Sequence, residues 1–125
     1  MFVLAVDFDG TLVYDNYPKI GKLRSHAKEV INYFYDNGVQ IIIWTCRYVE
    51  QDLLSMIKFL KSNHIKYHEI NKNSKILQGF DPKPKIYYDL LIDDRAIGCP
   101  VDDWLQIYRI ILNKINEKQC KESRK

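Results

Sequence analysis

The first apolar run of the chain ends in two acidic residues one position apart. Residues 2–11 read FVLAVDFDGT. Because alternate side chains of a β-strand point to the same face, Asp7 and Asp9 can converge on one point. Gly10 then lets the backbone turn where a β-carbon would obstruct it. An Asp-Gly turn explains Asp9 and Gly10, but not a further acid at Asp7 at the end of a buried run. The pattern therefore indicates a carboxylate site for a divalent cation, or a carboxylate nucleophile for phosphoryl transfer.

A second apolar run, near the other end of the chain, also ends in acids. Residues 89–95 read DLLIDDR, with Asp93 and Asp94 in tandem. Adjacent like charges repel and burial raises the pKa of a carboxyl group, so this pair requires a counter-charge. A bound metal ion supplies one.

Two further elements fit the same kind of site. Residues 40–47 read QIIIWTCR, a buried-strand pattern that ends in the hydroxyl of Thr45. Residues 82–85 read PKPK and can bring the ammonium group of Lys83 or Lys85 to the sheet. The chain thus offers a nucleophile, a proton donor, a hydrogen-bond donor for phosphate oxygens and a positive charge.

The periodicity predicts alternating strands and helices. Strands are expected at residues 2–8, 40–44, 66–70 and 88–92, and helices around 23–34, 53–60 and 104–115. Near-continuous apolar strands are typical of a parallel sheet covered on both faces. Ligands of such sheets bind beyond the carboxyl ends of the strands, where the acids and Thr45 fall. Asn37-Gly38 is expected to end the first helix, and Asp102 or Asp103 to cap the third.

Together these segments resemble the four signature motifs of the haloacid dehalogenase (HAD) superfamily, whose members are mostly Mg-dependent phosphatases. Residues 7–11 are similar to the first motif and Thr45 to the second. A lysine at 83 or 85 is similar to the third, and residues 93–94 to the fourth. Each motif is weak alone, and their order and spacing make the resemblance specific.

The resemblance implies catalytic roles for the acids. Asp7 would attack phosphorus and form an aspartyl phosphate, which divides one difficult hydrolysis into two displacements. Asp9 would protonate the leaving alkoxide and then deprotonate the attacking water. Mg²⁺ would be bound by Asp7, the backbone carbonyl of Asp9, Asp93 and Asp94.

The remaining site residues would bind the phosphate. Thr45 would donate a hydrogen bond to it, and a lysine would add positive charge. Lys85 is favoured over Lys83 because it lies four residues before Asp89, a spacing that resembles related small hydrolases. We assign to substrate binding Gly10, Thr11, Cys46, Arg47 and Lys83. Arg47 and Arg95 each follow a motif and can either contact substrate or pair with a neighbouring acid.

The expected fold is α/β: a Rossmann-like three-layer α/β/α sandwich with a parallel sheet, as the HAD resemblance implies. The stretches between the motifs are too short for a large cap, so we expect a minimal cap in which residues 13–22 form a flap. One domain is expected at residues 1–117, followed by a charged, flexible tail at 118–125.

Composition favours a cytoplasmic protein. The chain has 125 residues, of which 46% are hydrophobic, and no apolar run approaches the length that spans a bilayer. Its start lacks the positive leader of a signal peptide. Three cysteines without Cys-x-x-Cys spacing indicate neither a disulfide framework nor a zinc site.

Three functions remain open from the sequence. The leading one is hydrolysis of a small phosphorylated metabolite or nucleotide. The second is removal of phosphate from nucleic-acid ends, with mild support from a net charge of +3 and from tyrosines near the motifs. The third is a non-catalytic scaffold, which the presence of every catalytic residue type disfavours.

Overall fold

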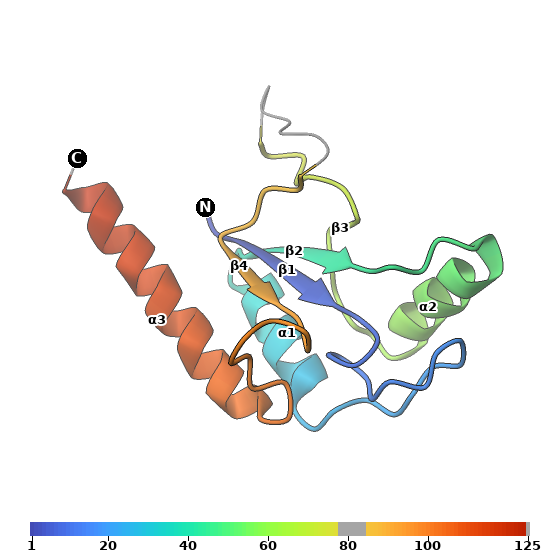
Figure 1. The fold of residues 1–125 in the computed structure, drawn as a ribbon. Coiled ribbons are helices and arrows are strands. Elements are labelled where there is room, and N and C mark those ends of the chain that lie inside the picture. Colours follow the sequence, from blue (N-terminus) through green and yellow to red (C-terminus); the bar gives the residue numbers. More distant parts are fainter. Residues whose placement is uncertain (78–84, 125) are drawn as a thin grey trace.

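The computed structural model describes residues 1–77 and 85–124 and contains a four-stranded parallel sheet (Figure 1). The strands are β1 (Val3–Asp7), β2 (Gln40–Trp44), β3 (Glu69–Ile70) and β4 (Leu90–Ile92), in the order β3-β2-β1-β4. The helices are α1 (Ala27–Asp36), α2 (Glu50–Ser62) and α3 (Trp104–Ser123). The predicted α/β class and the all-parallel sheet are therefore confirmed.

The helices pack on one face of the sheet. Leu4 and Val6 of β1 belong to a core cluster that contains buried residues of α1, α2 and α3. Val3 points to the opposite face and packs with Ile42 and Ile86. No residue of a described helix belongs to this second cluster, so the predicted third layer is not confirmed. Within the described part of the chain, the segment just before β4 covers that face.

The third strand is shorter than expected. It pairs with β2 through Glu69 and Ile70 alone, whereas the pattern predicts a strand from residue 66. The backbone N–H of Lys66 donates to the side chain of Asn32, on α1, at 2.8 Å. Because that donor is already used by a side chain, the chain joins the sheet only later.

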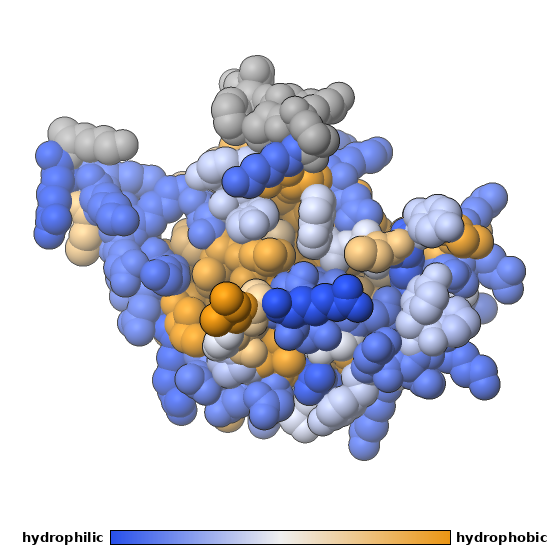
Figure 2. Space-filling view, viewed as in Figure 1, coloured by the Kyte–Doolittle hydropathy of each residue, from blue (hydrophilic) through white to orange (hydrophobic). Residues whose placement is uncertain are grey.

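The last helix continues through much of the segment expected to be a tail. Helix α3 begins at the predicted cap, where the Asp103 carboxylate accepts a hydrogen bond from the backbone N–H of Gln106. Lys118 donates to the backbone oxygen of Met1 at 2.6 Å and to Asp89 at 3.0 Å. The segment expected to be a flexible tail from residue 118 is instead helical as far as Ser123, where these polar contacts help to anchor the helix. Its outer surface is mainly hydrophilic, whereas hydrophobic residues gather over the middle of the sheet (Figure 2).

The segment after β1 forms the expected flap, residues 13–22. Its base is a small hairpin in which Tyr14 N–H donates to Lys22 O and Arg24 N–H donates to Leu12 O, both at 2.9 Å. Helix α1 follows directly. Within residues 1–77 and 85–124, no helix combines the length and apolar character needed to cross a bilayer.

Candidate functional site

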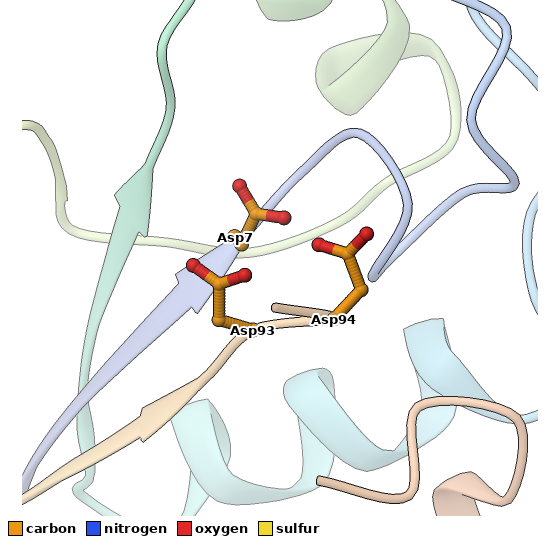
Figure 3. Close-up of side chains that lie close together, drawn as sticks. All are labelled: Asp7, Asp93 and Asp94. Atoms are coloured by element: carbon orange, nitrogen blue, oxygen red, sulfur yellow. The ribbon is translucent and has the colours of Figure 1, made fainter. Parts of the chain in front are cut away.

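Three carboxylates meet at the carboxyl end of β1 and β4 (Figure 3). Val6 pairs with Ile92 in the parallel ladder, so the residues that follow, Asp7 and Asp93, emerge side by side. Asp7, Asp93 and Asp94 each offer an oxygen within 4.8 Å of the others. The structure therefore brings together acids from opposite ends of the sequence, and such a set of hard oxygen ligands suits Mg²⁺.

The electrostatics of this cluster are unfavourable without a cation. The pKa of Asp7 is raised from 3.8 to about 7, chiefly by burial and further by the charges of Asp93 and Asp94. A hydrogen bond from Thr11 opposes this rise in pKa. A bound cation would favour the ionised carboxylate and reverse the shift.

Thr11 lies behind the acids rather than in contact with solvent. Its side chain is fully buried. The hydroxyl group donates to Asp7 Oδ2 at 2.9 Å and accepts from the backbone N–H of Asp94, also at 2.9 Å. Thr11 thus ties the first motif to the fourth, and in this arrangement it is not available for the predicted contact with substrate.

Gly10 has a structural role at the same place. Its φ angle is +87°, and a β-carbon added there would overlap the Asp94 carboxylate, with Asp94 Cγ only 2.8 Å away. The Gly10 carbonyl accepts two hydrogen bonds from the Arg24 guanidinium. The glycine allows close approach of two motifs, which is a different role from the predicted contact with substrate.

Asp9 points away from the three-carboxylate cluster and toward Arg47. Arg47 Nε and Nη2 donate to the two Asp9 oxygens at 2.7 and 2.8 Å, a bidentate ion pair. The Arg47 side chain is nearly inaccessible, and the bond to Asp9 raises the pKa of its guanidinium further. Of the two alternatives considered for Arg47, pairing with a neighbouring acid is the one the structure has.

Thr45 follows β2 and is held by a residue that the sequence analysis missed. The Asn71 side chain accepts from Thr45 N–H and donates to Thr45 O, both at 2.8 Å. Asn71 follows β3 with a φ angle of +53°, a left-handed conformation that asparagine tolerates. The sequence signal that could have identified Asn71 is its place directly after the predicted strand at residues 66–70. The Thr45 hydroxyl oxygen accepts from Arg47 N–H at 3.1 Å.

These residues surround a cavity of about 680 Å³. Its lining combines acids of the motifs, the flap tip, the residues after β2 and the residue after Asp94: Asp7, Asp9, Asp15, Asn16, Tyr17, Cys46, Arg47, Asp93, Asp94 and Arg95. The predicted Cys46 is therefore present in the wall. Among the described lining residues Arg47 and Arg95 are the two cations, and Arg95 is the solvent-exposed one.

The structure does not bring Lys85 to this cavity. Lys85 is exposed and precedes Ile86, which packs against Val3 and Ile42 on the sheet face that carries no helix. The chain enters β4 from the amino end of the strands, near the N-terminus (Figure 1), whereas the acids lie at the carboxyl end. Lys83 lies outside the described residues.

A search of solved structures found a protein that is similar to this chain. The structure described as that of a conserved protein coded by a locus from Bacteroides thetaiotaomicron is similar to this chain, with a TM-score of 0.77 and 34% sequence identity over 90% of each chain. The two proteins belong to one family. Since the match covers nine-tenths of both chains, these two proteins share the fold almost from end to end. No protein-family model and no curated protein matched the chain.

Proposed function

We propose that this protein is a Mg-dependent phosphomonoester hydrolase with an HAD-like fold, acting through an aspartyl phosphate on Asp7. The observation that carries the proposal is the meeting of Asp7, Asp93 and Asp94 at one edge of a parallel sheet. A scaffold protein has no need of three like charges at one strand end, where two of them are half-buried, because their repulsion costs stability. A site that binds a divalent cation and an anionic substrate does need them.

The residues fit a magnesium ion. All three side chains offer hard oxygen ligands, and the pKa of Asp7 is raised chiefly by burial and further by the neighbouring charges of Asp93 and Asp94. Asp7, Asp93 and Asp94 would hold the ion, together with the backbone carbonyl of Asp9. When bound, Mg²⁺ would neutralise charge on the phosphate and on the nucleophile.

The protein side chains would carry out the two displacements. A carboxylate oxygen of Asp7, oriented by the Thr11 hydroxyl, attacks phosphorus while the ester P–O bond breaks. Asp9, which is paired with Arg47 in the structure, must be protonated at the start of this step, and it gives its proton to the departing alkoxide. Asp9 then takes a proton from water as that water attacks the phosphorus of the aspartyl phosphate, which releases inorganic phosphate and restores Asp7.

Arg95 is our candidate for the positive charge that the resemblance assigns to a lysine of the third motif. It is exposed, lines the cavity, and lies directly after the tandem acids. The Arg47 guanidinium, by contrast, is already paired with Asp9. A guanidinium binds two phosphate oxygens at once, so Arg95 is suited to hold the substrate phosphate or a second anionic group.

A nucleotide or nucleic-acid end is the substrate that one further observation favours. Tyr17 in the cavity wall is 51% exposed, and Tyr48, beside Arg47, is 85% exposed. Exposed aromatic rings next to a phosphate site can stack on bases. A minimal cap also leaves the cavity open enough to admit a substrate larger than a metabolite.

The proposal is tested by measuring phosphate release from an aryl phosphate, a nucleotide panel and oligonucleotides phosphorylated at either end. Magnesium-dependent turnover that is lost in Asp7→Asn supports the hydrolase, and the panel then ranks the substrates. If folded, magnesium-binding wild-type protein releases no phosphate from any of them, the proposal fails.

A further inference from the structure

Arg47 uses its whole guanidinium within the protein. Nε and Nη2 donate to Asp9, and Nη2 also donates to Lys19 O at 3.3 Å. Nη1 donates to Pro18 O at 3.2 Å and to Asp52 O at 3.1 Å. An arginine side chain has five N–H donors, and these five contacts account for all of them.

The partners of Arg47 come from three separate parts of the chain. Asp9 belongs to the first motif, Pro18 and Lys19 to the flap, and Asp52 to the first turn of α2. The residue is only 2% exposed. Its guanidinium also lies over the ring of Tyr17, in the flap, at 5.0 Å from the ring centroid. A buried cation with every donor used has no hydrogen bond left for a substrate.

We infer that Arg47 is a positioning residue that couples the orientation of Asp9 to the position of the flap. The part of this inference that concerns proton transfer by Asp9 rests on the proposed function. The coupling itself rests on the contacts alone. A bidentate pair fixes both carboxylate oxygens of Asp9 and stops rotation of the side chain.

Coupling follows from the cost of leaving a buried donor without a partner. If the flap moves away, two Arg47 donors lose the carbonyls of Pro18 and Lys19. The present position of the guanidinium against Asp9 then becomes less stable. If Asp9 is replaced by a neutral residue, the guanidinium is left with an unpaired buried charge and the flap is held less firmly. Such coupling is reciprocal, so a change at Asp9 must alter the stability of the flap position, and a change in the flap must alter the orientation of Asp9.

The coupling is tested without reference to activity by amide hydrogen exchange over residues 13–22. We expect Asp9→Asn and Arg47→Gln each to speed exchange in the flap by about 10- to 100-fold, because charged hydrogen bonds are lost. The control is Arg109→Gln, which removes an exposed arginine on α3 and should leave flap exchange unchanged. Unchanged flap exchange in folded Asp9→Asn overturns the coupling.

Arg47 is buried, so Arg47→Gln can fail to fold. Asp9→Asn alters a partly exposed residue and decides the coupling without that variant. Arg47→Lys keeps the charge but not the planar fork, and it should restore folding while leaving flap exchange faster than in the wild type. Wild-type flap exchange in Arg47→Lys would show that charge alone holds the flap and would overturn the role of the fork.

The effect on proton transfer is tested by comparing substrates with good and poor leaving groups. A dinitrophenyl phosphate needs little protonation of its leaving group, whereas an alkyl phosphate needs it fully. Arg47→Lys should lose about 100-fold on the alkyl ester and far less on the dinitrophenyl ester, the same pattern as Asp9→Asn. The double variant with Asp9→Asn and Arg47→Lys should hydrolyse the alkyl ester no more slowly than Asp9→Asn alone.

Equal losses on both esters, or additive losses in the double variant, would mean that Arg47 does not act through Asp9. A wild-type protein that hydrolyses neither these esters nor any substrate of the panel refutes the proposed function but leaves the exchange result standing. The two failures are therefore distinguishable.

Discussion

The Asp94 carboxylate packs against Gly10 and occupies the space that a β-carbon at position 10 would need. The two residues come from opposite ends of the sequence, and their contact is what allows Asp94 to approach Asp7. The site therefore depends on a residue without a side chain as much as on the acids themselves.

Gly10→Ala should disrupt the site more than it disrupts the fold. The alanine needs both a φ of +87° and the space of the Asp94 side chain, so we expect a loss of about 1–3 kcal/mol in unfolding free energy and greatly weakened Mg²⁺ binding. Denaturant unfolding and magnesium titration measure the two effects.

Gly38→Ala is the matched control, because Gly38 has a φ of +86° with nothing within 4 Å of an added β-carbon. It should cost about 1 kcal/mol and leave Mg²⁺ binding intact. Equal Mg²⁺ affinity in the two variants would contradict this account.

Thr11→Val should destabilise the protein by about 1–3 kcal/mol, because the part-buried N–H of Asp94 loses its acceptor. Asp7 also loses a hydrogen bond that lowers its pKa, so that pKa should rise further. Thermal unfolding and magnesium titration report these changes. Thr11→Ser keeps the hydroxyl group and should recover most of the loss. If serine behaves like valine, the methyl group of Thr11 matters rather than its hydroxyl.

The metal-free protein should lose stability as the pH rises through the range in which Asp7 titrates. Below pH 3.8, the ordinary pKa, both folded and unfolded states hold the proton. Between that value and about 7, the folded state binds more protons, so stability falls with increasing pH. Above about 7 both states are ionised and the loss is complete. Because solvent reaches Asp7 in part, we expect a loss of only about 1–2 kcal/mol.

The comparison for this pH effect is Asp7→Asn, measured by urea unfolding at several pH values in a chelator. The variant should lack this component of the pH dependence and be more stable than the wild type near neutral pH. Magnesium should stabilise the wild type more at pH 8 than at pH 5, with little effect on Asp7→Asn. Parallel stability curves for the two proteins would refute the role given to Asp7.

Arg95→Gln and Lys85→Gln separate the two candidates for the positive charge. Since Arg95 lines the cavity and Lys85 does not, Arg95→Gln should reduce kcat/KM about 10- to 100-fold, whereas Lys85→Gln should change it little. Steady-state kinetics on the best substrate of the panel decide between them. The opposite result would favour the motif-based assignment of Lys85 over the cavity-based assignment of Arg95.

Much of the fold could be predicted because it depends on local patterns. The apolar run of β2 has the predicted bounds, Gln40–Trp44, since it is bordered by clear turn and polar residues. Helix α2 contains the whole of the predicted apolar stripe, residues 53–60, and extends beyond it to Ser62. The bounds of β3 and α3 could not be predicted in this way. They depend on Asn32, Met1 and Asp89, which are far away in the sequence.

The features of the candidate site also separate into those that local sequence patterns determine and those that depend on tertiary contacts. By itself the sequence determined that Asp7, Asp93 and Asp94 stand at strand ends, because the alternation and length of apolar runs are local properties. Only the tertiary structure decided what the neighbouring polar groups do. It directed Asp9 to Arg47, buried Thr11 behind the acids and placed Arg95, rather than Lys85, in the cavity wall. The physical reason is that a polar group that leaves water must find a partner, and that partner is chosen by proximity in space rather than in sequence.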